Sequence, residues 1–246
     1  MSFIAVIPAR FGSMRLPGKP LLEIAGQPMI QHVYTRALSS RAERVIVATD
    51  DQRIDDVVKG FGGECLMTAS DHPTGTDRLA EVADILGLAA DAIIVNVQGD
   101  EPLLPASAIH QVADMLVTHP EASIATLCEP IHVLSDIEDP NQVKVVKSRS
   151  GRALYFSRIR IPGHPALNVG RHYRHIGLYA YRAGFLRDFR TWEPTPLEKF
   201  ERLEQLRALE HDRLIQVDVA VESIPPGVDT EQDLEMIRQH LENPSV

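Results

Sequence analysis

Phe3-Ile4-Ala5-Val6-Ile7 is a short apolar run that stops at Pro8. Such a run predicts a fully buried strand, which ends at the proline because proline cannot donate a hydrogen bond to a sheet. Apolar residues then recur at helical spacing between positions 29 and 38, and Val45-Ile46-Val47-Ala48 repeats the strand pattern. A strand, a helix and a second strand in this order indicate a parallel sheet.

The same alternation continues through the first half of the chain. Apolar spacing predicts helices around residues 54–61, 79–86 and 109–116. Between the last two lies a strong strand signal, Ile93-Ile94-Val95-Asn96-Val97. The first half is therefore predicted to be a doubly wound α/β unit.

The pattern changes after Ser123. Residues 143–147 and 153–156 flank a polar turn that contains glycine, and together they predict an antiparallel hairpin. Residues 175–181 predict a further strand. We therefore expect an antiparallel extension of the parallel sheet.

The remaining segments predict a helix, a strand and a helix. A long helix is expected after Pro196, with one apolar side formed by Leu197, Phe200, Leu203, Leu206 and Leu209. Alternating residues predict a half-exposed strand over 215–221, and Thr230 is expected to cap a final helix. No repeat or long linker interrupts the chain, so we expect a single domain over residues 1–246.

Composition excludes several classes of protein. A formal net charge of −9 argues against nucleic-acid binding by bulk electrostatics. No apolar stretch reaches the roughly 18 residues that a membrane-spanning helix needs, so no membrane contact is expected. The first residues lack the pattern of a secretory signal. Cys65 and Cys128 are too few for a disulfide framework or a thiolate metal site, so we expect two inert buried thiols in a cytoplasmic protein.

The loop after the first strand is the first candidate for a binding site, because ligands of open parallel sheets bind outside the carboxyl ends of the strands. It comprises Pro8-Ala9-Arg10-Phe11-Gly12-Ser13-Met14-Arg15-Leu16-Pro17-Gly18-Lys19-Pro20, with three cations, a serine and two glycines. Cations and free backbone N–H groups in one loop suit a triphosphate. The chain has no Walker motif, and a solvated basic turn is the alternative interpretation.

Two acidic residues are candidate metal ligands. Asp100 lies in Gln98-Gly99-Asp100-Glu101-Pro102, just beyond a predicted buried strand. A carboxylate there is well placed to hold Mg²⁺ together with substrate phosphates. Asp229 lies in Pro225-Pro226-Gly227-Val228-Asp229-Thr230. The alternatives are an aspartate that starts a turn and an acid at a helix N-terminus, and spacing alone cannot pair two residues so far apart.

A series of longer motifs runs in order along nearly the whole chain. They are Ile7-Pro8-Ala9-Arg10, Arg15-Leu16-Pro17-Gly18-Lys19-Pro20, Ala48-Thr49-Asp50, Gly75-Thr76-Asp77-Arg78, Asn96-Val97-Gln98-Gly99-Asp100-Glu101-Pro102, Leu154-Tyr155-Phe156-Ser157-Arg158, His175-Ile176-Gly177-Leu178-Tyr179-Ala180-Tyr181-Arg182 and Gly227-Val228-Asp229-Thr230. Together they closely resemble the 3-deoxy-manno-octulosonate cytidylyltransferase family, the CMP-Kdo synthetases of lipopolysaccharide biosynthesis.

This resemblance implies a nucleotide-diphospho-sugar transferase-like fold, a three-layer α/β sandwich with a mixed, mainly parallel sheet and an antiparallel extension. It implies that CTP and the sugar acid Kdo are converted to CMP-Kdo and pyrophosphate, with Mg²⁺ as cofactor. The anomeric oxygen of Kdo would attack the α-phosphorus of CTP in line, without a covalent enzyme intermediate. The family also implies a cytoplasmic homodimer, with nucleotide binding in residues 1–122 and sugar binding and dimerisation in residues 123–246.

The resemblance further implies roles for individual residues. The catalytic residues would be Arg10, Lys19, Asp100 and Asp229, with Asp100 and Asp229 holding Mg²⁺. The nucleotide would contact Ala9, Arg10, Ser13, Lys19, Thr74, Gly75, Thr76, Arg78 and Asp100. The sugar acid would contact Gln98, Arg158, His175, Glu204 and Gln205. Arg158 would bind the carboxylate of the sugar, because a guanidinium can bind a carboxylate bidentately.

Alternatives remain for these residues and for the substrate. His175 could be a structural strand histidine, and Glu204 and Gln205 could lie on a solvated helix face. After Ile161-Pro162 this chain has Gly163-His164-Pro165-Ala166-Leu167, where the family commonly has an aromatic residue and an Arg/Asp-rich stretch. A related acid such as 8-amino-Kdo or a sialic-acid-like sugar is therefore an alternative substrate.

Two other classes of protein also remain open. One is a nucleotide-sugar binding module without turnover, and the other is a metal-dependent glycosyltransferase. The glycosyltransferase is disfavoured because no Asp-x-Asp triplet follows a predicted buried strand.

Overall fold

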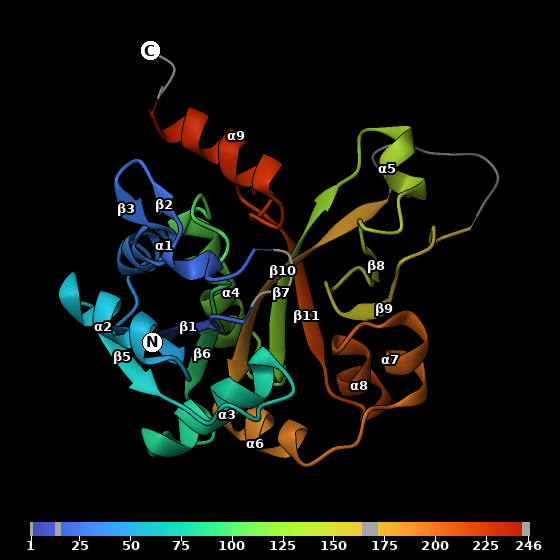
Figure 1. The fold of residues 1–246 in the computed structure, drawn as a ribbon. Coiled ribbons are helices and arrows are strands. Elements are labelled where there is room, and N and C mark those ends of the chain that lie inside the picture. The colour runs from blue at the N-terminus through green and yellow to red at the C-terminus, as the bar shows by residue number, and fades with distance from the viewer. Residues whose placement is uncertain (1, 13–15, 164–171, 243–246) are drawn as a thin grey trace.

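One mixed sheet forms the centre of the molecule (Figure 1). The computed structural model describes residues 2–12, 16–163 and 172–242, and within them nine strands join in this sheet. The strands are β1 (Ile4–Ala9), β4 (Arg44–Thr49), β5 (Glu64–Met67), β6 (Ile93–Asn96), β7 (Ile124–Pro130), β8 (Lys144–Lys147), β9 (Ala153–Ser157), β10 (Tyr173–Arg182) and β11 (Ile215–Val219). Seven of them lie in the order β11-β7-β10-β6-β1-β4-β5, and β8 pairs with both β10 and β9.

Six of these seven strands run in the same direction. β1 pairs in parallel with β4 and β6, β4 pairs in parallel with β5, and β7 pairs in parallel with β11. β10 is the exception, because it runs antiparallel to β6, β7 and β8. The expected mixed, mainly parallel sheet is confirmed. The predicted antiparallel hairpin is also confirmed, as β8 and β9.

Helices cover both faces of the sheet. Because successive strand residues point to opposite faces, Ala5 and Ile7 belong to one buried cluster, whereas Ile4 and Val6 belong to another. The first cluster includes residues of α1 (Met29–Leu38), α2 (Gln52–Gly60) and α4 (Ala106–Thr118). The second includes residues of α3 (Gly75–Ile85), α6 (Ala183–Arg190) and α8 (Gln205–Glu210). This arrangement is the expected three-layer sandwich.

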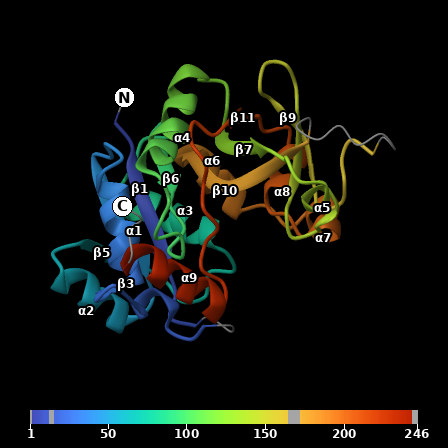
Figure 2. The ribbon, with the colours of Figure 1, turned by 90° about the horizontal axis from the view of Figure 1, so that it is seen from above.

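The second half of the chain extends the structure to one side and then returns. In Figures 1 and 2, α5 (Leu134–Glu138), α7 (Pro196–Glu201), β8 and β9 lie on the opposite side of β10 from α1 and α2. The last helix, α9 (Glu231–Glu242), contacts β2 (Glu23–Ile24), which pairs with β3 (Gln27–Pro28) in a small second sheet. A third buried cluster joins these segments through Leu16, Ile24, Met29, Val228, Leu234 and Ile237.

The prediction of one long helix after Pro196 is wrong. The chain forms two short helices, α7 and α8, because Arg202 adopts a left-handed conformation with φ 56° and ends α7. The apolar side does not continue across this break: Leu203 and Leu206 are buried, whereas Phe200 is 85% exposed. The break turns Glu204 and Gln205 inward, where they line a small cavity together with Thr76.

The structure also corrects the prediction of a half-exposed strand over residues 215–221, both in its length and in its exposure. β11 ends at Val219, and Gln216, expected on the exposed face, is buried. The reason is tertiary: Nε2 of Gln216 donates to the carbonyl of Ser150 in the β8–β9 turn, which covers this side of the strand. The predicted cap of the last helix is confirmed, since Thr230 Oγ1 accepts from the N–H of Asp233 at 3.2 Å.

The two cysteines are free thiols, as predicted. Cys128 is buried and Cys65 is partly buried, and burial raises the pKa of each thiol to about 12. Neither is therefore a reactive thiolate near neutral pH. Within the described residues, no helix has the length and apolar character needed to cross a bilayer.

Candidate active site

A cavity of about 310 Å³ lies at the carboxyl ends of β1 and β6. This is where ligands of a parallel sheet are expected, because the loops that follow the strands converge there. The cavity contains most of the predicted nucleotide-binding residues. Its lining residues are Pro8, Ala9, Arg10, Gly12, Lys19, Pro20, Pro73, Thr74, Gly75, Gln98, Gly99 and Asp100.

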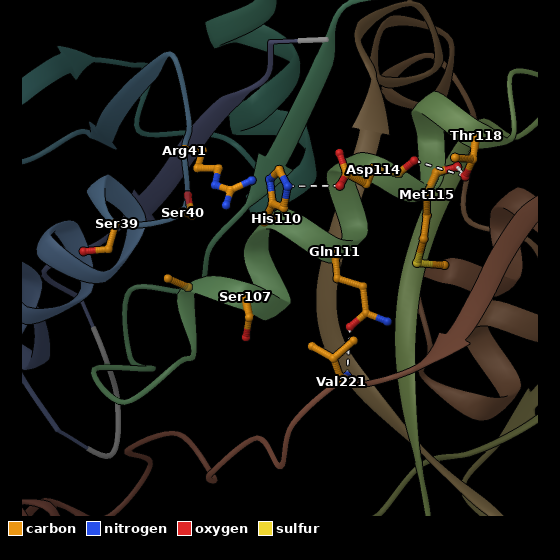
Figure 3. Close-up of a pocket in the computed structure, with 11 residues that line it drawn as sticks. Ser39, Ser40, Arg41, Ser107, His110, Gln111, Asp114, Met115, Thr118 and Val221 are labelled. Atoms are coloured by element: carbon orange, nitrogen blue, oxygen red, sulfur yellow. Dashed lines mark hydrogen bonds and ion pairs between the residues drawn. The ribbon is translucent and has the colours of Figure 1, made fainter.

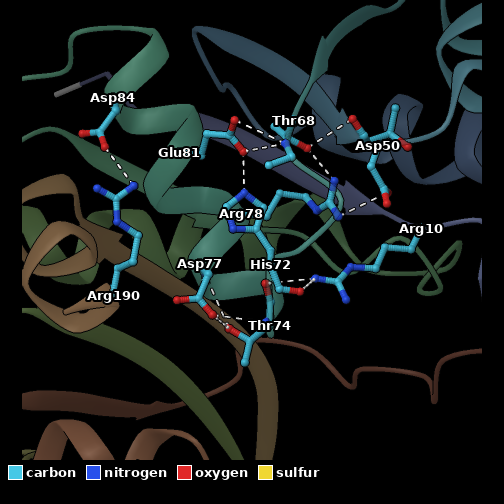
Figure 4. A network of polar contacts seen from close by, with 12 residues as sticks. Arg10, Asp50, Thr68, His72, Thr74, Asp77, Arg78, Glu81, Asp84 and Arg190 are labelled. Atoms are coloured by element: carbon cyan, nitrogen blue, oxygen red, sulfur yellow. Dashed lines mark hydrogen bonds and ion pairs between the residues drawn. The ribbon is translucent and has the colours of Figure 1, made fainter. Parts of the chain in front are cut away.

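Arg10 is oriented by backbone carbonyl groups from another loop. Its Nη2 donates to the carbonyl of His72 and, at 3.4 Å, to that of Thr74 (Figure 4). Nε and Nη1 of Arg10 make no hydrogen bond to another described residue. The guanidinium is therefore held in place while part of its donor capacity remains available to an anion in the cavity.

Lys19 brings the two candidate metal ligands together. It begins a short 3₁₀-helix, η1 (Lys19–Leu21), preceded by Gly18 with φ 68°, a backbone conformation that suits glycine. Its Nζ donates to Asp100 Oδ2 at 2.7 Å, to Asp229 Oδ1 at 3.3 Å and to the carbonyl of Val228 at 2.6 Å. Two carboxylates from opposite halves of the chain thus meet at one ammonium group beside the cavity.

These two carboxylates suit a magnesium ion in their chemistry. Mg²⁺ is commonly bound by one or two carboxylates together with substrate phosphates, rather than by a cage of protein ligands. The Asp100 side chain is 34% exposed and that of Asp229 is 54% exposed, so both are accessible from outside. Among the described residues, no group of three or more His, Cys, Asp or Glu side chains could hold a metal on its own.

A second cavity, of about 460 Å³, adjoins the first at Gln98 and Asp100. Gln98, predicted to contact the sugar, therefore lines both cavities. The second cavity is lined by Gln98, Asp100, Glu101, Gly177, Pro226, Gly227, Asp229 and Asp233. It therefore lies beside both candidate metal ligands.

Glu101 is a site residue that the sequence reasoning missed. Burial, reinforced by the charge of Asp100, raises the pKa of the Glu101 carboxyl to about 8. Its Oε2 is buried and has no hydrogen-bond partner among the described residues. The sequence contains a signal for it, because Glu101 directly follows Asp100 just beyond a buried strand, but the prediction gave a role only to Asp100.

Thr74, Gly75 and Thr76, at the start of α3, were predicted to contact the nucleotide, and we call them the nucleotide wall. Thr74 caps this helix, and its Oγ1 and the Asp77 carboxylate form a reciprocal capping box. Thr74 and Gly75 line the first cavity, whereas Thr76 is buried and lines a small neighbouring cavity of about 30 Å³. The helix N-terminus directs its free N–H groups toward this region, which suits a polar ligand.

Arg78 lies away from the cavity, although the resemblance implied that it contacts the nucleotide. Its side chain is fully buried and lines neither of the two cavities described above. Nη2 lies 3.2 Å from Asp50 Oδ1, and Nη1 donates to Thr68 Oγ1 at 2.5 Å (Figure 4). In this structure Arg78 thus links α3 to Asp50 and Thr68, which follow β4 and β5.

Glu204 and Gln205 line the small cavity next to Thr76, Tyr179 and Tyr181. They are not on a solvated helix face: Gln205 is buried, and burial raises the pKa of the Glu204 carboxyl. Thr74 Oγ1 donates to Glu204 Oε1 at 3.1 Å. The structure therefore brings these predicted sugar-side residues against the nucleotide wall from the second half of the chain.

His175 and Arg158 line neither the cavity of about 310 Å³ nor the adjoining cavity of about 460 Å³. His175 lies between the rings of Phe156 and Tyr179, with centroids 4.8 and 5.4 Å away, and its Nε2 is 3.0 Å from Thr126 Oγ1. Burial lowers the pKa of His175 to about 3.

The guanidinium of Arg158 donates to three backbone carbonyl groups, those of Glu201, Pro140 and Arg202. Its predicted contact with a sugar carboxylate would require these bonds to be exchanged. Ser13 and the residues 164–167 that depart from the family pattern lie outside the described residues.

A larger cavity, of about 540 Å³, lies on the outer side of α4 (Figure 3). It is lined by α4 and by the turn after α1, including Arg41, His110 and Asp114, and it shares no residue with the two cavities above. It is not at the carboxyl ends of the strands and contains no pair of converging carboxylates. Size alone therefore does not identify the site.

The chain is similar to known cytidylyltransferases in sequence and in structure. A family model described as "Cytidylyltransferase" matches residues 4–215. Proteins named 3-deoxy-manno-octulosonate cytidylyltransferase from Hahella chejuensis and Pseudomonas fluorescens are each 58% identical, over 96% of both chains and 98% of both chains, respectively. A solved structure of CMP:2-keto-3-deoxy-manno-octonic acid synthetase complexed with CTP is 42% identical, with a TM-score of 0.92 and full coverage of both chains. A cytidylyltransferase structure from Leptospira borgpetersenii, 17% identical with a TM-score of 0.63, shares the fold.

Proposed function

The chain belongs to the cytidylyltransferase family, and within it to the 3-deoxy-manno-octulosonate cytidylyltransferases, and from this premise we propose that it transfers the cytidylyl group of CTP to Kdo. The products would be CMP-Kdo and pyrophosphate, and CMP-Kdo would serve lipopolysaccharide biosynthesis. The observation that carries the proposal is the meeting of Asp100 and Asp229 at Lys19, between a cationic cavity and a second, adjoining cavity.

The proposed reaction is a single in-line displacement. The anomeric oxygen of Kdo forms a bond to the α-phosphorus of CTP, the bond from that phosphorus to the bridging oxygen breaks, and pyrophosphate leaves with the bond electrons. Catalysis of such a transfer is mainly positioning and stabilisation of charge. Arg10 and Lys19 lie where they can neutralise charge on the triphosphate, and the two adjoining cavities set the two substrates side by side.

We propose that Asp100 and Asp229 hold Mg²⁺. When bound, the ion would supply Lewis-acid activation of the attacking oxygen and neutralise charge on the triphosphate. Two partly exposed carboxylates at one point fit this preference. Lys19 would keep both loops together in the absence of substrate, because its ammonium contacts both carboxylates.

The test is pyrophosphate release by the purified chain with CTP, Kdo and Mg²⁺. We expect one pyrophosphate for each CMP-Kdo formed, and little release without Kdo. Parallel reactions with 8-amino-Kdo and neuraminic acid separate the alternative sugar acids. Binding of CTP without any release would contradict the proposal and favour a binding module.

We also propose that the enzyme is a cytoplasmic homodimer. Large apolar side chains are exposed on one part of the second half, including Leu154 on β9, Ile159 just after it, and Phe200 on α7. Such side chains in one region mark a protein interface more often than a solvated surface. Light scattering after size exclusion should give twice the chain mass, and Phe200→Glu should shift the protein toward monomer. A monomeric wild-type protein would contradict this. Its two free thiols suit a reducing compartment.

A further inference from the structure

Residues 69–73 connect β5 to α3 and run beside Arg10. Within the described part of the chain, no backbone–backbone hydrogen bond involves these five residues, and Pro73 has no N–H group to donate. The carbonyl of His72 instead accepts from Arg10 Nη2. The position of the Arg10 guanidinium therefore depends on whatever fixes this irregular segment.

Glu81 on α3 provides that fixed point. Its Oε2 accepts from the N–H of Ala69 at 3.0 Å and is hydrogen-bonded to Nε2 of His72 (Figure 4). Since an ionised carboxylate can only accept, His72 donates this bond. The side chains of His72 and Glu81 are 12% and 26% exposed, so water has limited access to the contact.

The α3 helix can hold such a contact because it is itself firmly packed. Leu79 and Val82, on either side of Glu81 in sequence, are fully buried against the sheet. His72 also precedes a proline, which restricts its backbone to extended conformations. One residue thus binds Glu81 through its ring and Arg10 through its carbonyl group.

We propose that His72 and Glu81 are positioning residues that set the guanidinium of Arg10 against the triphosphate of CTP. This inference rests on the proposed function, because it requires Arg10 to contact the nucleotide. Neither residue lines the cavity, so both act through the 69–73 segment. An arginine that is oriented before the ligand arrives loses less conformational freedom on binding.

The test is a double-mutant cycle on CTP affinity, measured by isothermal titration calorimetry with the full-length protein. The four proteins are wild type, R10A, H72A and R10A/H72A. If His72 acts through Arg10, H72A weakens CTP binding about tenfold in the wild-type background and less than about twofold in the R10A background. A purely structural role would weaken binding equally in both backgrounds.

Two further variants sharpen the result. His72→Gln places a side-chain N–H near the position of Nε2 and should restore most of the lost affinity. His110→Ala is the matched control, because His110 Nε2 forms a similar pair with Asp114 at 3.0 Å on α4, outside the site (Figure 3). It should leave CTP binding unchanged. If H72A does not fold, His72→Asn replaces it, since its amide is too short to reach Glu81.

The outcomes separate this inference from the proposed function. An equal loss of affinity in both backgrounds, in a wild-type protein that binds CTP and forms CMP-Kdo, overturns this inference alone. An H72Q protein as weak as H72A does the same, because the ring hydrogen bond would then not be the operative contact. A wild-type protein that does not bind CTP overturns both.

Discussion

Replacing Asp50 by alanine should destabilise the fold while leaving the nucleotide cavity intact. Arg78 is fully buried, and its Nη2 lies 3.2 Å from Asp50 Oδ1. Burial lowers the pKa of the Arg78 guanidinium, but arginine stays charged in proteins. Asp50→Ala therefore leaves a buried cation whose remaining side-chain partner among the described residues is Thr68.

The size of the effect follows from burial. Removing one partner of a buried ion pair costs about 3–5 kcal/mol of unfolding free energy. Water reaches the Asp50 side chain, which is 22% exposed, so we expect the lower end, about 3 kcal/mol. For a chain of this length, such a loss lowers Tm by about 6–12 °C.

Urea denaturation followed by circular dichroism measures the loss, and calorimetry measures Tm. Asp188→Ala is the matched control: its ion pair with Arg213 at 2.9 Å joins two well-exposed side chains, so its removal should cost less than about 1 kcal/mol. CTP affinity is measured in the same proteins below their Tm. If Asp50→Ala costs no more than the control, the buried-charge reasoning is refuted. If stability is kept and CTP affinity falls, Arg78 belongs to the nucleotide site after all.

Three other predictions concern the site and the pH dependence of stability. Asp100→Ala should abolish pyrophosphate release with little change in Tm, because its side chain is partly exposed and makes its ion pair with Lys19 at the cavity; near-normal activity in Mg²⁺ would count against the metal assignment. Gly227→Ala should lower kcat/KM and cost about 1 kcal/mol of stability, because a Cβ would lie 3.1 Å from the Asp100 carbonyl oxygen, whereas Gly60→Ala, which meets nothing within 4 Å, should leave activity unchanged. Burial lowers the pKa of His175 to about 3, so the unfolded chain, whose histidine titrates near pH 6.5, takes up this proton first as the pH falls. The unfolding free energy should therefore drop by about 1.4 kcal/mol per pH unit between pH 5.5 and 4.5 on account of this group. Urea denaturation of wild type and His175→Gln at both pH values should show a steeper loss in the wild type, and equal slopes would contradict the reasoning.

Local pattern was enough to predict the class of the fold and the edge of the sheet that carries the site. Strand and helix periods depend on residues a few positions apart, so β1, α1, β4 and the β8–β9 hairpin could be predicted from spacing. The rule that ligands bind at the carboxyl ends of parallel strands then located the loops of Arg10 and Asp100. The pattern failed at α7 and α8, because a left-handed turn at Arg202 ends a helix without any glycine to announce it.

The sequence by itself determined the alternating α/β order, the cationic loop, the two candidate acids and the family to which the chain belongs. Only the tertiary structure decided which of these groups meet. It placed Asp229 beside Asp100 at Lys19, paired the buried Arg78 with Asp50, and brought Glu204 against Thr74. The physical reason is that spacing along a chain constrains near neighbours, whereas contacts between distant segments are set by how their buried faces pack.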